Sequence, residues 1–106
     1  MNIAITTRGF KAPERLKSYV NEKVSRLDRF SDIIMNGEAI FSYEKLDQIV
    51  EIKLKLKHKV IRISERSDDI FKSVDLAIDN LERQVAKAKD KLKDFSSTKI
   101  VQNLEV

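Results

Sequence analysis

The segment of residues 68–93, DDIFKSVDLAIDNLERQVAKAKDKLK, repeats apolar residues at three- and four-residue steps. This spacing is typical of an amphipathic helix with one buried stripe. The stripe consists of Ile70, Val74, Ala77, Ile78, Leu81, Val85, Ala88 and Leu92. A helix of this kind has to cover another layer of the fold, which constrains the architecture of the whole chain.

The charged residues of the same segment are segregated by sign. At roughly 100° per residue, Arg83, Lys87 and Lys91 form a ridge along one side of the helix, and the sequence predicts no carboxylate among them. The acids lie round the other side: Asp75, Asp79 and Glu82. A generic solvated helix mixes its signs and gains ion pairs one turn apart. The basic ridge therefore favours a polyanion as the partner.

The clearest strand is residues 49–57, IVEIKLKLK, in which apolar and charged residues alternate. One face carries Val50, Ile52, Leu54 and Leu56, and the other carries Glu51, Lys53, Lys55 and Lys57. We expect further strands at residues 2–7, 38–44 and 60–64. A sheet with one apolar and one charged face needs cover on one side only. The exposed lysines are interpreted first as solubilising residues.

A second amphipathic helix is expected from Pro13 to about residue 30. Turn signals separate these elements at Arg8-Gly9, Asn36-Gly37 and His58-Lys59, and Ser67 with Asp68 is expected to cap the long helix. The order predicts an α+β fold, β-α-β-β-β-α. It forms a two-layer sandwich in which both helices cover one face of a four-stranded sheet. Residues 1–95 form the domain, and residues 96–106 are expected to be a mobile C-terminal tail.

Composition limits the function. The 106 residues are enough for one domain, and the net charge of +4 suits nucleic acid or an anionic membrane surface. There is no cysteine, which excludes disulfides and thiolate metal sites. No signal peptide or transmembrane segment is recognisable, so we expect a cytoplasmic protein without a membrane partner.

Residues able to carry out catalysis are scarce. His58 is the one histidine, and neither of the two glycines lies in a phosphate-binding motif. We interpret His58 as an exposed bystander and Asp68-Asp69 as helix-capping residues rather than a catalytic pair. The sequence predicts no enzyme, cofactor, metal or small-molecule substrate. From the residues alone, the chain is a small cytosolic α+β domain that binds nucleic acid, with the target unnamed.

The first helix carries a second basic group, Arg15, Arg26 and Arg29, with Lys23 near the edge of the core. Lys23 has to extend its ammonium group outward to reach water. Glu22 partly neutralises the group. Taken alone, these residues fit two interpretations equally well: a solvated face and a binding patch.

Three segments together resemble the bacterial ribosome hibernation factor family: YVNEKVSRLDRF (19–30), VEIKLKL (50–56) and DDIFKSVDLAIDNLERQVAKAKDKL (68–92). That family includes hibernation promoting factor and ribosome-associated inhibitor A. The resemblance spans residues 1 to about 93. It implies binding of the small ribosomal subunit and its rRNA at the decoding region. Occlusion of mRNA and of the A- and P-site tRNAs would block translation under stress or in stationary phase.

By position, the resemblance implies RNA contacts from both helices: Lys23, Arg26, Arg29, Arg83, Lys87, Lys89, Lys91 and Lys93. The family often has Lys at the position of Asn80, so this chain would make that contact without a positive charge. The chain resembles the short hibernation-promoting form, although a shortened long form would look the same.

Two alternatives remain open. One is a double-stranded-RNA-binding module, which would need a basic motif at the start of the second helix, where this chain has Asp68-Asp69. The other is a helix-mediated protein-interaction domain, since the apolar positions of the long helix approach a heptad pattern. The second alternative requires a dimer, whereas the hibernation factor reading predicts a monomer when free.

Overall fold

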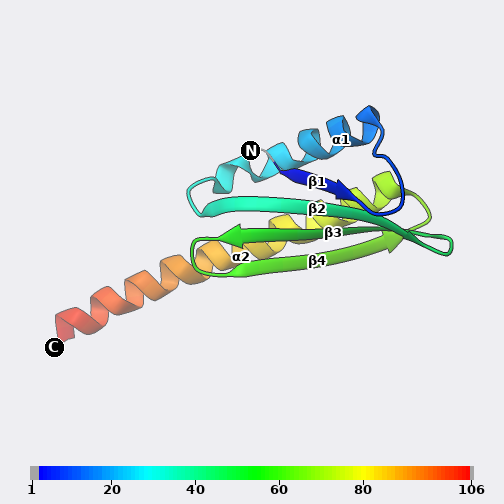
Figure 1. Ribbon diagram of the computed structural model, residues 1–106. Coiled ribbons are helices and arrows are strands. Elements are labelled where there is room, and N and C mark those ends of the chain that lie inside the picture. The colour runs from blue at the N-terminus through cyan, green and yellow to red at the C-terminus, as the bar shows by residue number, and fades with distance from the viewer. Residues whose placement is uncertain (1–2, 106) are drawn as a thin grey trace.

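The computed structural model describes the backbone of residues 3–105 and the side chains of residues 3–91. Two helices and a short 3-10 helix, η1, accompany four strands (Figure 1). In chain order the elements are β1 (Ala4–Thr7), α1 (Glu14–Val24), η1 (Ser25–Phe30), β2 (Ile34–Glu44), β3 (Asp47–Leu56), β4 (Val60–Ser67) and α2 (Ile70–Glu105). The predicted order is confirmed, and η1 forms the last part of the first predicted helix.

The strands form one mixed sheet in the order β1-β2-β3-β4. β1 runs parallel to β2, and the connection between them contains α1, as a parallel pair requires. β2, β3 and β4 pair antiparallel through two hairpins. β4 therefore forms one edge of the sheet, and the hairpin turn that precedes it lies at the end where β3 finishes (Figure 1).

The alternation of β3 gives the sheet its two faces. Val50, Ile52, Leu54 and Leu56 are each at most 2% exposed, whereas Lys53 and Lys55 are exposed. Ile52 lies between Ala39 of β2 and Ile63 of β4 in the strand register, so neighbouring strands turn their apolar residues to the same face. The predicted division of β3 into a buried and a charged face is confirmed.

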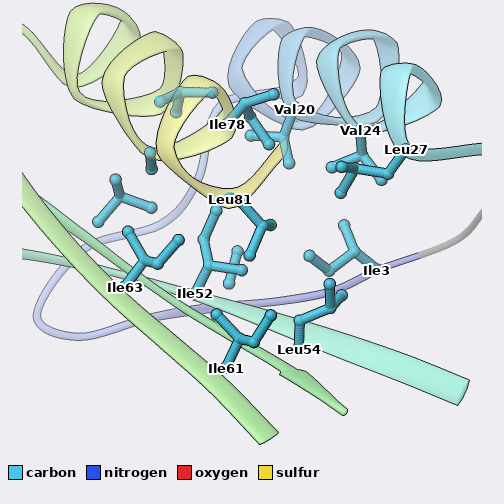
Figure 2. Packing of buried hydrophobic residues seen from close by; sticks show 14 of the residues in the cluster. Ile3, Val20, Val24, Leu27, Ile52, Leu54, Ile61, Ile63, Ile78 and Leu81 are labelled. Carbon is cyan, nitrogen blue, oxygen red and sulfur yellow. The ribbon is translucent and has the colours of Figure 1, made fainter. Parts of the chain in front are cut away.

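Both helices cover the apolar face of the sheet. Val20 and Val24 of α1 and Ile78 and Leu81 of α2 lie above the inner residues of the sheet, including Leu54 (Figure 2). Leu27 and Phe30 of η1 belong to the same buried cluster. One contiguous core joins the two layers, as the α+β sandwich predicts.

One predicted turn is wrong. Asn36-Gly37 lies inside β2, which begins at Ile34, and the register with β3 shifts between Ile34 and Asn36. Gly37 is needed for close packing: a Cβ there would lie 2.9 Å from Leu54 Cδ1 and 3.3 Å from the side chain of Ile3. A glycine within a strand can mark such a close approach as readily as a turn.

The start of α2 is capped one residue later than predicted. Asp69 Oδ1 accepts a hydrogen bond from the N–H of Phe71 at 2.9 Å, and the N–H of Ile70 donates to Gln48 Oε1 at 2.7 Å. Ser67 is instead the last residue of β4, where its hydroxyl lies 2.7 Å from Ser73 Oγ. These contacts tie the helix start to β3 and β4.

α2 continues to Glu105, beyond residue 93, where the apolar pattern predicts its end. Its last part extends past the end of the sheet (Figure 1). The side chains from residue 92 onward, including Lys93, lie outside the described residues. The mobility expected for residues 96–106 stays a prediction.

Candidate nucleic-acid interface

Arg83, Lys87 and Lys91 lie in a row on α2, and all three side chains are exposed. They sit opposite Leu81, Val85 and Ala88, which hold this stretch of the helix against the sheet. Among the described residues, none of the three cations forms an ion pair with a carboxylate. The acid-free ridge expected from the helical spacing is present as a structural feature, and its role in RNA binding stays a prediction.

The β3–β4 turn adds a lysine that the sequence analysis did not assign to the site. A hollow of about 370 Å³ is lined by Lys59, Gln84, Lys87, Ala88 and Lys91. Lys59 was expected only to form a turn. The signal available in the sequence was the basic cluster of residues 57–59, LysHisLys, but its position beside α2 depends on the tertiary packing. His58 is exposed, as expected.

Arg26 and Arg29 of η1 are neutralised by acids of α2. Arg26 Nη1 lies 2.9 Å from Asp79 Oδ1, and Arg26 Nη2 lies 2.6 Å from Glu82 Oε2, although the second contact lacks hydrogen-bond geometry. Arg29 Nη2 donates a hydrogen bond of 3.0 Å to Glu82 Oε1. The hydrogen bond that Arg26 donates to Asp79, together with the charge of Glu82, raises the pKa of Arg26. These guanidinium groups are already engaged with acids.

Lys23 and Lys89 are engaged more loosely. Lys23 Nζ lies 4.0 Å from Asp75 Oδ1 and 5.3 Å from the centre of the Tyr19 ring. Lys89 Nζ lies 3.5 Å from Asp32 Oδ2. Neither lysine is freely available to an anion, because each has a carboxylate within ion-pair distance. The structure thus separates the eight predicted RNA-binding residues into an unengaged ridge and an engaged flank, with Lys93 outside the described side chains.

Arg83 lies where these two groups meet. A second hollow, of about 340 Å³, is lined by Arg26, Arg29, Asp79, Glu82, Arg83 and Ala86. It contains three guanidinium groups and two carboxylates. The helical packing therefore brings the ridge next to the α1 and η1 cations, but with Asp79 and Glu82 between them.

Asn80 and Gln84 border the ridge on its sheet side. Gln84 Nε2 donates to Asn80 Oδ1 at 3.1 Å, and Asn80 Nδ2 lies 3.5 Å from Glu65 Oε1 on β4. Two neutral amides thus stand between the Glu65 carboxylate and the lysines at the far end of the ridge. Asn80 places no cation at this position.

The opposite end of the domain is aromatic and acidic. A hollow there includes Phe10, Tyr43, Asp68 and Asp69 in its lining. The rings of Phe10 and Tyr43 meet edge to face, with 4.7 Å between their centres. Asp69 Oδ1 accepts the N–H of Phe71 at the start of α2, and Arg15 also lines this hollow, so its lining carries both signs of charge.

Within residues 3–91, no group of three His, Asp or Glu side chains is placed to hold a metal ion. No helix in the described part of the chain is long and apolar enough to span a membrane.

The fold and the charge distribution define a small α+β domain with a basic surface on one side of its second helix. The chain belongs to the Sigma 54 modulation protein / S30EA ribosomal protein family, whose sequence model matches residues 3–93. The predicted resemblance to ribosome hibernation factors is confirmed by curated relatives with that name.

One relative is the ribosome hibernation promoting factor of Azotobacter vinelandii, 33% identical over 91 residues that cover 86% of this chain and 85% of the relative. Another is the ribosome hibernation promotion factor of Staphylococcus aureus (strain COL). It is 30% identical over 82 residues, covering 74% of this chain but only 43% of the relative. The alignment thus spans less than half of the second, longer protein.

Two solved structures have the same fold. A ribosomal subunit interface protein from Coxiella burnetii superposes with a TM-score of 0.80 and 34% identity, covering 85% of this chain and 99% of that one. The N-terminal domain of Protein Y from Thermus thermophilus superposes with a TM-score of 0.76 and 30% identity, covering 82% and 98%. Both neighbours confirm the predicted α+β architecture.

Proposed function

We propose that this protein is a cytoplasmic ribosome hibernation factor that binds the small ribosomal subunit at the decoding region. It blocks translation there by occupying the path of mRNA and of the A- and P-site tRNAs, under stress or in stationary phase. The family membership and the names of the curated relatives support the ribosome as the partner. It acts by binding and not by catalysis.

The observation that carries the proposal is the ridge of Arg83, Lys87 and Lys91. These cations are exposed and, within the described residues, free of ion pairs, while Arg26 and Arg29 of η1 are engaged with acids. Cations that neutralise RNA phosphates release condensed counterions, which favours binding. Arginine adds forked hydrogen bonds to a phosphate, so Arg83 suits the same target.

The two-layer fold makes the ridge rigid. Val85 and Ala88, on the buried side of the same helical turns, are 0% and 3% exposed. Packing already fixes the helix backbone that carries the cations, so binding costs little ordering of the backbone and more of the electrostatic attraction appears as affinity. The shape of the domain and the match between its cations and the phosphate spacing can then select a unique RNA-lined cleft without base-specific contacts.

The test is sedimentation of the protein with purified small subunits, comparing the wild type with Arg83→Glu/Lys87→Glu/Lys91→Glu. We expect the affinity of this variant to fall by about 1,000-fold or more, because three contacts of about 1.5 kcal/mol each are lost. Circular dichroism checks that the fold is intact, since all three residues are exposed.

The matched control is Lys53→Glu/Lys55→Glu/Arg62→Glu on the uncovered face of the sheet, where the same number of charges is reversed. Lys53 pairs with Arg62 across β3 and β4, so these residues also form a compact basic group. We expect the control to bind nearly as well as the wild type at moderate salt. Undiminished sedimentation of the ridge variant, or equal losses in the two, would contradict the proposal.

A further inference from the structure

The β3–β4 turn places a lysine against the end of the basic ridge. The N–H of Leu56 donates to the carbonyl of Lys59 at 2.8 Å, which closes the turn directly before β4. α2 packs against β3 and β4, so the turn lies beside the middle of the helix (Figure 1). There Lys59, Lys87 and Lys91 line one hollow, although Lys59 is almost thirty residues away along the chain.

The lining of this hollow determines which ligands it suits. Besides the three lysines, the described residues that line it are Gln84, with its amide, and Ala88, with its methyl group. Pockets for small organic molecules are lined mainly by apolar and aromatic side chains, and this one is not. Each ammonium group is a triple hydrogen-bond donor without an acceptor. The matching ligand is a compact anion with acceptor oxygens on several sides, which describes a phosphate group.

The lysines have no competing acid in the hollow. Among the described residues, none of the three lysines forms an ion pair with a carboxylate. Asp90 is exposed on α2 and makes no ion pair with Lys87 or Lys91. Glu65 is turned toward Asn80, at 3.5 Å. Three neighbouring ammonium groups repel one another in the free protein, and an anion between them relieves this repulsion.

The other hollow on this side of the molecule shows the contrast. It is similar in size, about 340 Å³, and has three arginines in its lining. Asp79 and Glu82 line it as well, and they hold Arg26 at 2.9 and 2.6 Å. An incoming anion would have to displace these carboxylates. Charge number and volume alone therefore do not distinguish the two hollows, but the absence of acids does.

We propose that Lys59, Lys87 and Lys91 together hold one backbone phosphate of the bound RNA. This inference deepens the proposed function and rests on it for the identity of the RNA. Lys59 is the residue of this phosphate site that comes from the sheet and not from α2. Because it is fixed to the β3–β4 turn rather than to α2, it fixes the angle at which the RNA strand crosses the helix. The RNA-binding surface thus includes the turn as well as the two helices.

The first test compares Lys59→Gln with Lys45→Gln in the full chain. Lys45 lies in the β2–β3 turn at the other end of the sheet, so both variants remove one charge from a hairpin turn. For Lys59→Gln we expect about tenfold weaker binding to small subunits. The slope of log K against log[salt] should become less steep by about 0.7–0.9. Lys45→Gln should match the wild type. If the wild type binds and both variants match it, the phosphate site is wrong.

The second test does not depend on the ribosome. Tetrauridylate, inorganic pyrophosphate and uridine are each titrated into ¹⁵N-labelled protein while the amide resonances are followed. We expect saturable shifts at Lys59, Gln84, Lys87 and Lys91 with tetrauridylate, no shifts with uridine, and loss of the shifts in Lys59→Gln.

The outcomes separate the two proposals. Shifts at the hollow without sedimentation on ribosomes would keep the phosphate site and overturn the proposed function. Far tighter binding of pyrophosphate than of tetrauridylate would identify a site for free phosphates and overturn the assignment to RNA. No shift with either phosphate compound would overturn the site itself.

Discussion

Tyr19 connects the two helices through a single carboxylate. Its hydroxyl donates a hydrogen bond of 2.5 Å to Asp75 Oδ1, and its ring meets that of Phe71 edge to face at 5.1 Å. The hydrogen bond to Asp75, followed by partial burial and the nearby negative charges, raises the pKa of Tyr19 from 10.0 to about 12. Loss of the phenol proton would place two anions side by side.

We predict that this coupling is visible in the absorbance of the phenolate. In a Tyr43→Phe background Tyr19 is the one remaining tyrosine, and it should ionise near pH 12. Adding Asp75→Asn should return the midpoint toward the ordinary value of about 10. Since the pKa is raised by folding, the stabilisation is complete below pH 10.0 and is lost as the pH rises to about 12. An unchanged midpoint in the Asp75→Asn variant would refute the coupling.

At the scale of the elements, α2 divides its surface by charge. Asp79 and Glu82 pair with cations of η1, whereas Lys87 and Lys91 line the hollow at the β3–β4 turn. Arg83 lies between these two groups. This division lets one helix bind its neighbour and still present a basic ridge. The carboxylates next to Arg26 and Arg29 therefore weaken the attraction of this flank for RNA.

We predict that Glu82→Gln strengthens binding to small subunits by several-fold, because it removes a negative charge beside Arg26, Arg29 and Arg83. The free energy of unfolding should fall by no more than about 1 kcal/mol, since the arginine partners are largely exposed. Glu44→Gln is the control, because Glu44 pairs with Arg66 at 3.7 Å at the other end of the sheet. Weaker binding of Glu82→Gln would show that the ion pairs position the arginines for RNA.

The same scale shows what the sequence could and could not predict. The ridge on α2 and the two faces of β3 follow from periodicity, which depends only on the local conformation. The pairing of Arg26 with Asp79 and Glu82 depends on how α1 and α2 rotate against each other, and periodicity does not fix that rotation. Gly37 and Lys59 were missed for a similar reason. Each of them depends on contacts with a distant segment of the chain. Gly37 packs against Leu54 and Ile3, and Lys59 lies beside α2.

The coiled-coil alternative receives no support from the described residues. The apolar stripe of α2 from Ile70 to Ala88 is buried in the core of the same chain. That part of the helix has no apolar face left for a second copy, so the expectation of a free monomer stands as a prediction.

For the whole molecule, the two ends differ in chemical character. The end with the β3–β4 turn carries Lys59 beside Lys87 and Lys91, and the opposite end carries Asp68 and Asp69 beside aromatic rings. A strongly negative target attracts the first end more than the second, where Arg15 lies beside two acids. The domain should therefore approach RNA in one preferred orientation.

Occlusion at the decoding region predicts competition with the normal ligands of the subunit. Small subunits preloaded with mRNA and tRNA should bind the protein at least about tenfold more weakly than empty subunits, since two phosphate-rich ligands cannot share one site. Labelled tRNA released by added protein would report the same exclusion. The ridge variant, which lacks the basic contact, serves as the control. Simultaneous, independent binding of tRNA and protein would place the site elsewhere on the subunit.

The parallel pairing of β1 with β2 across α1 has a consequence for the nascent polypeptide. β1 is synthesised first but cannot join the sheet until α1 and β2 have left the exit tunnel, and α2 emerges only after all four strands. A half-made chain thus has neither a closed hydrophobic layer nor the ridge. Until α2 has been synthesised, the nascent chain therefore lacks the surface on which the proposed function depends.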